Sequence, residues 1–232
     1  LHPAGAEVLR AAFERGWARP DGLSAASAQA RHLLNSAREE IAAALRVSPT
    51  EVEFWGEPAL ISPIAIMGAS HFAQGKFIVG ATERQEILAV GARAKSMAVI
   101  PVSHYGLIDR DQLLEELTND ATVAIQAANV ETGVQQDLAD LTPLVGGLGA
   151  HLHLDFTAAG PLVKLPPYWS TADFPAKSWD GPAGLGVMLI NNEQRWANPL
   201  ALNTAHRAPG SFSLPLALAA AAHRHACSER GP

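Results

Sequence analysis

The chain has 232 residues, 48% of them hydrophobic and 17% charged, and carries a net charge of −6. This composition is typical of a globular protein with a sizeable core, and the acidic balance argues against binding to nucleic acid or to a membrane surface, which requires a basic patch. The single cysteine, Cys227, excludes a disulfide framework and fits a cytoplasmic protein, and the longest apolar run, residues 214–222, is too short to cross a bilayer.

Helical and strand-like periodicities alternate along the chain. Residues 1–22 are interpreted as an N-terminal arm, and a long amphipathic helix is expected over Ser24–Arg46. The pattern that follows predicts strands at Val52–Trp55, Phe77–Gly80, Met97–Val102, Val123–Ala127, His151–Phe156 and Gly186–Ile190, and helices at Ala59–Gly68, Glu83–Ala92, Asp109–Leu117, Gln136–Leu148 and Ser213–Cys227. Short apolar strands between helices predict an α/β fold with a mainly parallel sheet covered on both faces.

Polar segments follow several of these strands, at the edge where such sheets bind their ligands. Residues 55–58 precede a helix whose free N–H groups could hold a phosphate. Asp155 ends a strand, and Lys177 precedes the Gly-Pro-Ala-Gly-Leu-Gly turn of residues 181–186. A lysine that forms an imine and a carboxylate that keeps a pyridine nitrogen protonated are the groups that a pyridoxal phosphate (PLP) enzyme needs.

Six stretches then resemble a known family in the same order along the chain. They are SAREEIAAAL, EVEFWGEPALISPIAIMG, IVGATERQEIL, AANVETGVQQDL, HLHLDFTAAG and KSWDGPAGLGVMLI. The chain resembles the class V, fold-type I PLP enzymes, most closely the cysteine desulfurases, from about residue 24 to 220. The resemblance implies a three-layer PLP-dependent transferase-like large domain over residues 23–232, a homodimer and an amino acid substrate. It also implies a C-terminal small domain with a persulfide-forming cysteine, which we expect this chain to lack.

Several site residues are implied by the resemblance. Asp155 would pair with the pyridine nitrogen, Asn129 would hydrogen-bond the phenolic oxygen, and Lys177 would form the aldimine. Thr157 lies close to where the family has a glutamine, and Arg207 matches the arginine of the family's Arg-Ser-Gly-Thr segment. Asn129 could instead simply stabilise a turn, as asparagines after strands commonly do.

Three departures from the family fall in the same pocket. The phosphate loop reads Gly56-Glu57-Pro58, which offers no hydroxyl and adds a carboxylate that could instead cap the helix. Arg84 stands where the family has a ring-stacking histidine; it can stack on a ring but cannot act as a proton-transfer base. The family's lysine stands three residues before the Gly-Pro pair, a position that Ser178 occupies here, with Lys177 one residue away.

The sequence therefore leaves two functions open. One is a PLP-dependent cysteine desulfurase or aminotransferase-like enzyme, and the other is a catalytically inactive, cofactor-free dimer with a binding or regulatory role. A metal site is conceivable at His151, His153 and Asp155, which share one face of a strand. No fourth ligand can be identified, so we predict no metal.

Overall fold

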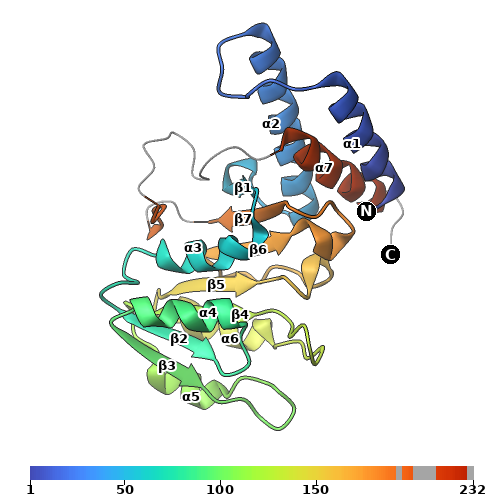
Figure 1. The fold of residues 1–232 in the computed structure, drawn as a ribbon. Coiled ribbons are helices and arrows are strands. Elements are labelled where there is room, and N and C mark those ends of the chain that lie inside the picture. The colour runs from blue at the N-terminus through green and yellow to red at the C-terminus, as the bar shows by residue number, and fades with distance from the viewer. Residues whose placement is uncertain (192–194, 201–212, 229–232) are drawn as a thin grey trace.

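The computed structural model describes residues 1–191, 195–200 and 213–228. One seven-stranded sheet runs through it in the order β1-β7-β6-β5-β4-β2-β3 (Figure 1). Strands β2 to β6 are parallel to their neighbours within that group, and β7 runs antiparallel to both β6 and β1. The predicted mainly parallel sheet is thus confirmed, with bounds β1 Val52–Trp55, β2 Lys76–Gly80, β3 Ser96–Ile100, β4 Thr122–Gln126, β5 His151–Asp155, β6 Thr171–Pro175 and β7 Gly186–Ile190.

Helices cover both faces of the sheet and complete the three layers (Figure 1). The short helices α3 (Ile61–Met67) and α4 (Gln85–Val90) lie on one face. The other face carries the main core and is covered by α2 (Ala25–Leu45), α5 (Arg110–Glu116), α6 (Leu138–Gly147) and α7 (Leu214–Ser228). No helix in the described part of the chain is both long enough and apolar enough to cross a membrane.

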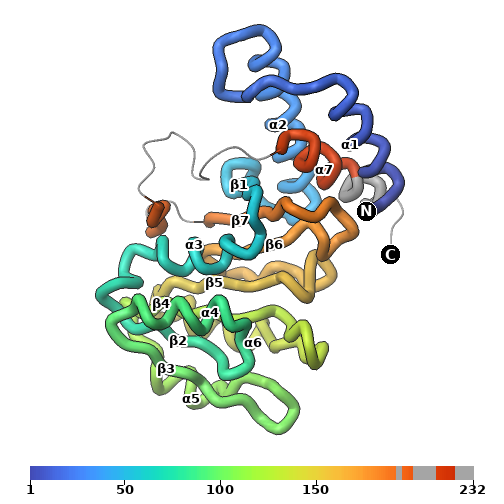
Figure 2. Tube along the Cα trace, viewed as in Figure 1, coloured from blue at the N-terminus to red at the C-terminus, as the bar shows by residue number. Residues whose placement is uncertain are grey.

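Two elements were missing from the sequence interpretation. The segment 1–22 contains a helix, α1 (Pro3–Arg15), which lies along α7 in Figures 1 and 2. The central strand β6 was also missed, because five residues that include an aspartate and end in Pro175 do not read as a buried strand. Pro175 is tolerated because it is the last residue of β6, opposite Gly186 of β7.

The predicted boundaries hold to within a few residues. Asp109 caps α5 as expected, since its side chain accepts the N–H groups of Asp111 and Gln112. The helix predicted over Glu83–Ala92 begins later than expected, at Gln85, which leaves Glu83 buried in the turn before it. That displacement matters for the site, because the turn faces the ends of β4 and β5.

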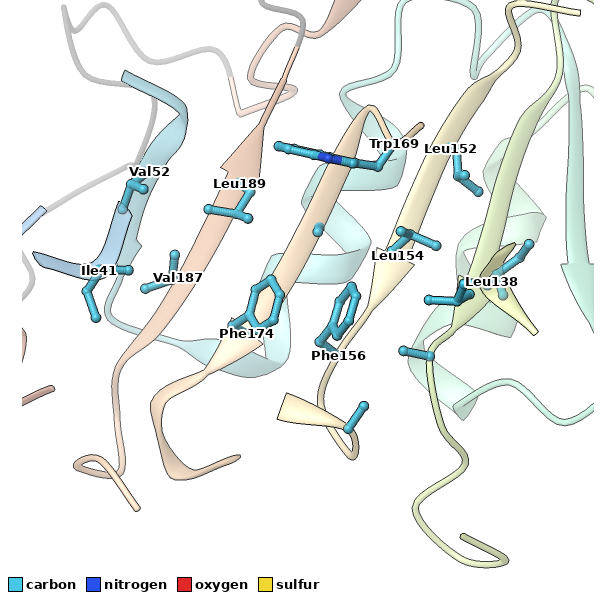
Figure 3. Packing of buried hydrophobic residues seen from close by; sticks show 14 of the residues in the cluster. Ile41, Val52, Leu138, Leu152, Leu154, Phe156, Trp169, Phe174, Val187 and Leu189 are labelled. Atoms are coloured by element: carbon cyan, nitrogen blue, oxygen red, sulfur yellow. The ribbon is translucent and has the colours of Figure 1, made fainter. Parts of the chain in front are cut away.

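The main core is centred on two aromatic rings from neighbouring strands. Phe156 and Phe174 stack with their ring centroids 4.4 Å apart, and both are almost fully buried (Figure 3). Leucines of β5 and β7 extend the same apolar layer on either side. This layer lies on the α2–α6 side of the sheet, so polar side chains of the same strands must point to the opposite face.

We expect Phe156→Ala to lower the free energy of unfolding by about 3–5 kcal/mol, because it leaves a cavity against Phe174. Leu162→Ala is the control: that side chain is 90% exposed, and its removal should cost less than about 0.5 kcal/mol. Denaturant unfolding of both variants measures the difference. Equal costs would contradict this description of the core.

Candidate functional site

A row of buried polar side chains runs along β5 and β6 on the face beneath α3. They alternate along the strands with the apolar residues of the main core, as the pleat requires. None is more than 6% exposed, and the row consists of His151, His153, Asp155, Thr171 and Asp173. Asp155 and Asp173 are paired in the register of the two strands, so two carboxylates lie side by side near the carboxyl end of the sheet.

Arg84, the residue before α4, supplies the cation for these carboxylates. Its Nε atom donates to Asp155 Oδ2 at 2.6 Å, and its Nη2 lies 3.9 Å from Asp173 Oδ2. The same Nη2 donates to the Ser62 hydroxyl at 2.9 Å, and Nη1 donates to Glu86 at 3.2 Å. All three guanidinium nitrogens are therefore engaged, and the Arg84 side chain is only 17% exposed.

The two aspartates differ in their protonation. Burial acts to raise the pKa of Asp155, but the Arg84 guanidinium and the hydrogen bond from the Thr157 N–H outweigh it, so that this pKa lies below its ordinary value. Burial and the neighbouring Asp155 charge raise the pKa of Asp173 well above its ordinary value. Of the two buried aspartates, Asp155 is thus the one that stays ionised beside the guanidinium, while Asp173 keeps its proton to a higher pH.

Glu83 is a third buried acid that sequence reasoning did not single out. Its Oε1 accepts the N–H of Gln126 at 2.7 Å, and its other oxygen is buried without a hydrogen-bond partner among the described residues. Burial and the charge of Asp155 raise the pKa of Glu83 well above its ordinary value. The sequence feature that could have identified Glu83 is its position directly before Arg84, in the turn that packs over β4.

The two histidines of the row share one hydroxyl group. Thr171 Oγ1 lies 3.0 Å from His153 Nδ1 and 3.3 Å from His151 Nε2. Burial lowers the pKa of His153 to about 4 and that of His151 to about 3. Their common face is as predicted, but within the described ranges no three histidine, cysteine or acidic side chains are grouped closely enough to hold a metal ion.

Lys177 lies in a short 3-10 turn, Ala176–Trp179, directly after β6. It is exposed, and its side chain makes no hydrogen bond or ion pair with the described residues. Ser178, at the family's lysine position, donates to the carbonyl oxygen of Pro175 at 2.8 Å. The loop after β5 packs tightly against it, since a Cβ at Gly160 would lie 2.6 Å from the Ser178 carbonyl oxygen.

The remaining predicted residues are occupied by contacts within the protein. Asn129 Oδ1 accepts the N–H groups of Glu131 and Thr132, and its Nδ2 donates to the carbonyl oxygen of Thr82, so it stabilises a turn. The N–H of Thr157 donates to Asp155 Oδ1 at 2.7 Å. Arg207 lies outside the described residues.

The loop at residues 56–58, which the resemblance assigns to the phosphate, also makes a hydrogen bond within the protein. Gly56 is exposed, and the carboxylate of Glu57 accepts the N–H of Ala59 at 3.3 Å at the start of the following turn. The side chain therefore does cap this turn. It places a negative group where a phosphate would need free N–H groups.

Taken together, these residues do not fit PLP. Asp155, to which the resemblance assigns the pyridine nitrogen, is already bonded to Arg84 and Thr157, and Glu57 caps the turn to which the resemblance assigns the phosphate. The lysine is turned to solvent. The arrangement is that of a closed ion-pair cluster in which protein groups satisfy one another.

We expect Arg84→Ala to lower the free energy of unfolding by about 3–5 kcal/mol, because it leaves the buried Asp155 charge without a counterion. Arg110→Ala, which removes a pair with Asp140 in which both side chains are nearly half exposed, should cost less than about 1 kcal/mol. Denaturant unfolding near neutral pH compares the two. A cost for Arg84→Ala as small as that of the control would show that the buried pair is not formed.

The buried histidines predict a loss of stability in acid. Each stays neutral in the folded protein down to about pH 4 or below, whereas a histidine in the unfolded chain binds a proton near pH 6.5. The unfolded state therefore binds more protons in this interval, and stability falls as the pH falls from 6.5 to 4.

The expected contribution is about 1.4 kcal/mol per pH unit for each histidine. NMR titration of the imidazole signals tests it directly, and His153→Gln should remove its share of the slope of unfolding free energy against pH. Titration of both rings near pH 6.5 in the folded protein would contradict the prediction.

Comparison with known proteins identifies the family of this chain. The model of the family described as Aminotransferase class-V matches residues 7–206. A cysteine desulfurase IscS of Vibrio cholerae serotype O1 (strain M66-2) is 28% identical over 178 residues, which are 72% of this chain and 44% of that protein. A cysteine desulfurase of Frankia sp. (strain EuIK1) is 29% identical over 216 residues, 85% of this chain and 51% of that protein.

A solved structure of a NifS-like protein superimposes with a TM-score of 0.87 at 21% identity, covering 99% of this chain and 67% of that one. It supports the fold alone. The chain spans about half the length of the curated relatives that it matches. On the family match, which covers most of its length, the chain belongs to the class V aminotransferase family.

Proposed function

We propose that this chain is a non-catalytic member of its family that keeps the PLP-transferase fold for a binding or regulatory role and does not use PLP. The observation that carries this proposal is the 2.6 Å ion pair between Arg84 and Asp155. In this family's fold the aspartate at that position would serve the cofactor's pyridine nitrogen. Here a side chain of the protein itself provides the positive charge.

A cofactor could bind at Asp155 only by breaking the Arg84–Asp155 ion pair, and this is energetically unfavourable. A pyridine ring would have to displace a guanidinium that also binds Ser62 and Glu86, and would have to replace its charge beside Asp155. Moving Arg84 out of its partly buried place would leave Asp155 buried without a counterion until the ring arrived. Both steps oppose cofactor binding.

The lysine position supports the same proposal. Ser178 is held by Pro175 and by the close approach of Gly160, so the position that carries lysine in the family serves local packing. The adjacent Lys177 side chain is exposed. An imine at Lys177 would require that this turn be rebuilt.

A second candidate function is a PLP-dependent cysteine desulfurase-like or aminotransferase-like activity on an amino acid, with Lys177 forming the aldimine. The observation in its favour is the place of Lys177 in the turn between β6 and the Gly181–Gly186 segment. The names of the curated relatives favour it too. In either case we expect a cytoplasmic homodimer, as cysteine desulfurases typically form dimers.

The test is incubation of the purified protein with saturating PLP, followed by absorbance spectroscopy, borohydride reduction and peptide mass mapping. We expect no aldimine band and no preferential label on Lys177. A cysteine desulfurase treated in parallel shows that the assay detects an aldimine.

Lys177→Ala is the matched variant, because borohydride can label any exposed lysine weakly. We expect wild type and variant to give the same spectrum and the same background. An aldimine band in the wild type that disappears in Lys177→Ala would overturn the proposal in favour of the enzyme.

A further inference from the structure

A cavity of about 500 Å³ lies away from the Asp155 site, between the end of α2 and the loop of residues 161–167. Its size is within the range of small-molecule sites. Most of its lining residues are apolar, among them Trp169 and Phe174 from the sheet side and Val163 and Leu165 from the loop, and its exposed surface combines apolar and polar atoms. Phe174 points to the face opposite its neighbour Asp173, so this cavity and the Arg84 cluster lie on opposite faces of β6.

Two cations line the cavity, Arg46 and Lys164. Both are exposed, and neither side chain makes an ion pair or a hydrogen bond with the residues that the structure describes. The acidic residue in the lining, Glu51, is already engaged, since its carboxylate accepts the N–H of Ser48 at 2.6 Å in a capping box. The cavity thus combines largely apolar lining residues with two cations that have no partner among the described residues.

Arg46 occupies this place at a cost in backbone energy. It ends α2 in the left-handed conformation, with φ 59° and ψ 43°. Glycine is the usual residue at such a position because any Cβ is disfavoured there. A long cationic side chain held in this conformation at the edge of a cavity points to a use for the side chain itself.

We propose that this cavity binds a small organic anion with an aromatic or bulky apolar body. The body would lie against the half-buried side chains of Val163 and Leu165, and the anionic group would be held by Arg46 and Lys164. A guanidinium donates to carboxylates, sulfonates and phosphates alike. The site does not depend on whether Asp155 or Lys177 serves a cofactor. It can therefore be tested independently of the proposed function.

A neighbouring cavity of about 710 Å³ shares the loop residues 163–166. It is lined by Lys164 and by Asp137, and Arg46 is not part of its wall. One cation lies beside one carboxylate there, whereas the first cavity has two cations beside one carboxylate, Glu51. The first cavity is therefore the better site for an anionic ligand.

The test uses two fluorescent probes of almost the same shape. Anilinonaphthalene sulfonate carries an anionic group on an aromatic body, and phenylnaphthylamine is the same body without the sulfonate. We expect the wild-type protein to bind one sulfonate probe per chain, about tenfold more tightly than the neutral probe, as one charge-assisted hydrogen bond would provide.

Arg46→Gly and Lys164→Ala should each abolish most of that preference while the neutral probe still binds. Glycine suits the backbone at position 46, so the first variant should fold at least as well as the wild type. Lys95→Ala removes an exposed cation outside the cavity lining and should leave both affinities unchanged.

Three results would overturn the proposal. They are no saturable binding of either probe to the wild type, equal affinity for the two probes, and a charge preference that persists in the Arg46→Gly/Lys164→Ala double variant. Near-UV circular dichroism of each variant establishes that probe fluorescence comes from the folded protein. None of these results bears on the PLP assay, which reports on Lys177.

Discussion

The buried charge of Asp155 is the constraint on which the rest of the site depends. A carboxylate at the end of a central strand, almost without exposure, needs a cation or a proton. Arg84 supplies the cation at 2.6 Å, and Asp155 is the buried carboxylate that it contacts most closely. Burial and the Asp155 charge raise the pKa of Asp173, beside it in the sheet, and the same two causes raise the pKa of Glu83. The tight turn before α4 is what brings the guanidinium to the sheet.

Polar side chains in the loops around this pair are also hydrogen-bonded to other groups of the protein. Asn129 is used within its own turn, Glu57 caps the turn after β1, and Ser178 bonds to Pro175. Groups that the family resemblance assigns to a cofactor thus have protein partners at several separate points. Any one of these substitutions could be accommodated by a bound ring. That all of these groups have partners within the protein favours a site without a cofactor.

The sheet was predictable because its apolar strands alternate with helices, and Asp155 could be placed at a strand end from the sequence alone. Strand β6 could not be predicted from the sequence. Its aspartate and its terminal proline are unusual in a buried strand, and it is buried because it lies between β5 and β7. The contact between Arg84 and Asp155 joins residues 71 positions apart. Only the fold brings them together, and so the sequence could identify Arg84 as a departure without showing what it binds.

Strand β6 therefore divides two separate environments: a polar cluster beneath α3, and the aromatic layer and cavity on the other face. The central claim concerns the first, and a crystal structure of the protein grown with saturating PLP tests it most directly. We expect Arg84 Nε to remain bonded to Asp155, with no ring between them. A pyridine nitrogen facing Asp155, with the Arg84 side chain displaced, would contradict it.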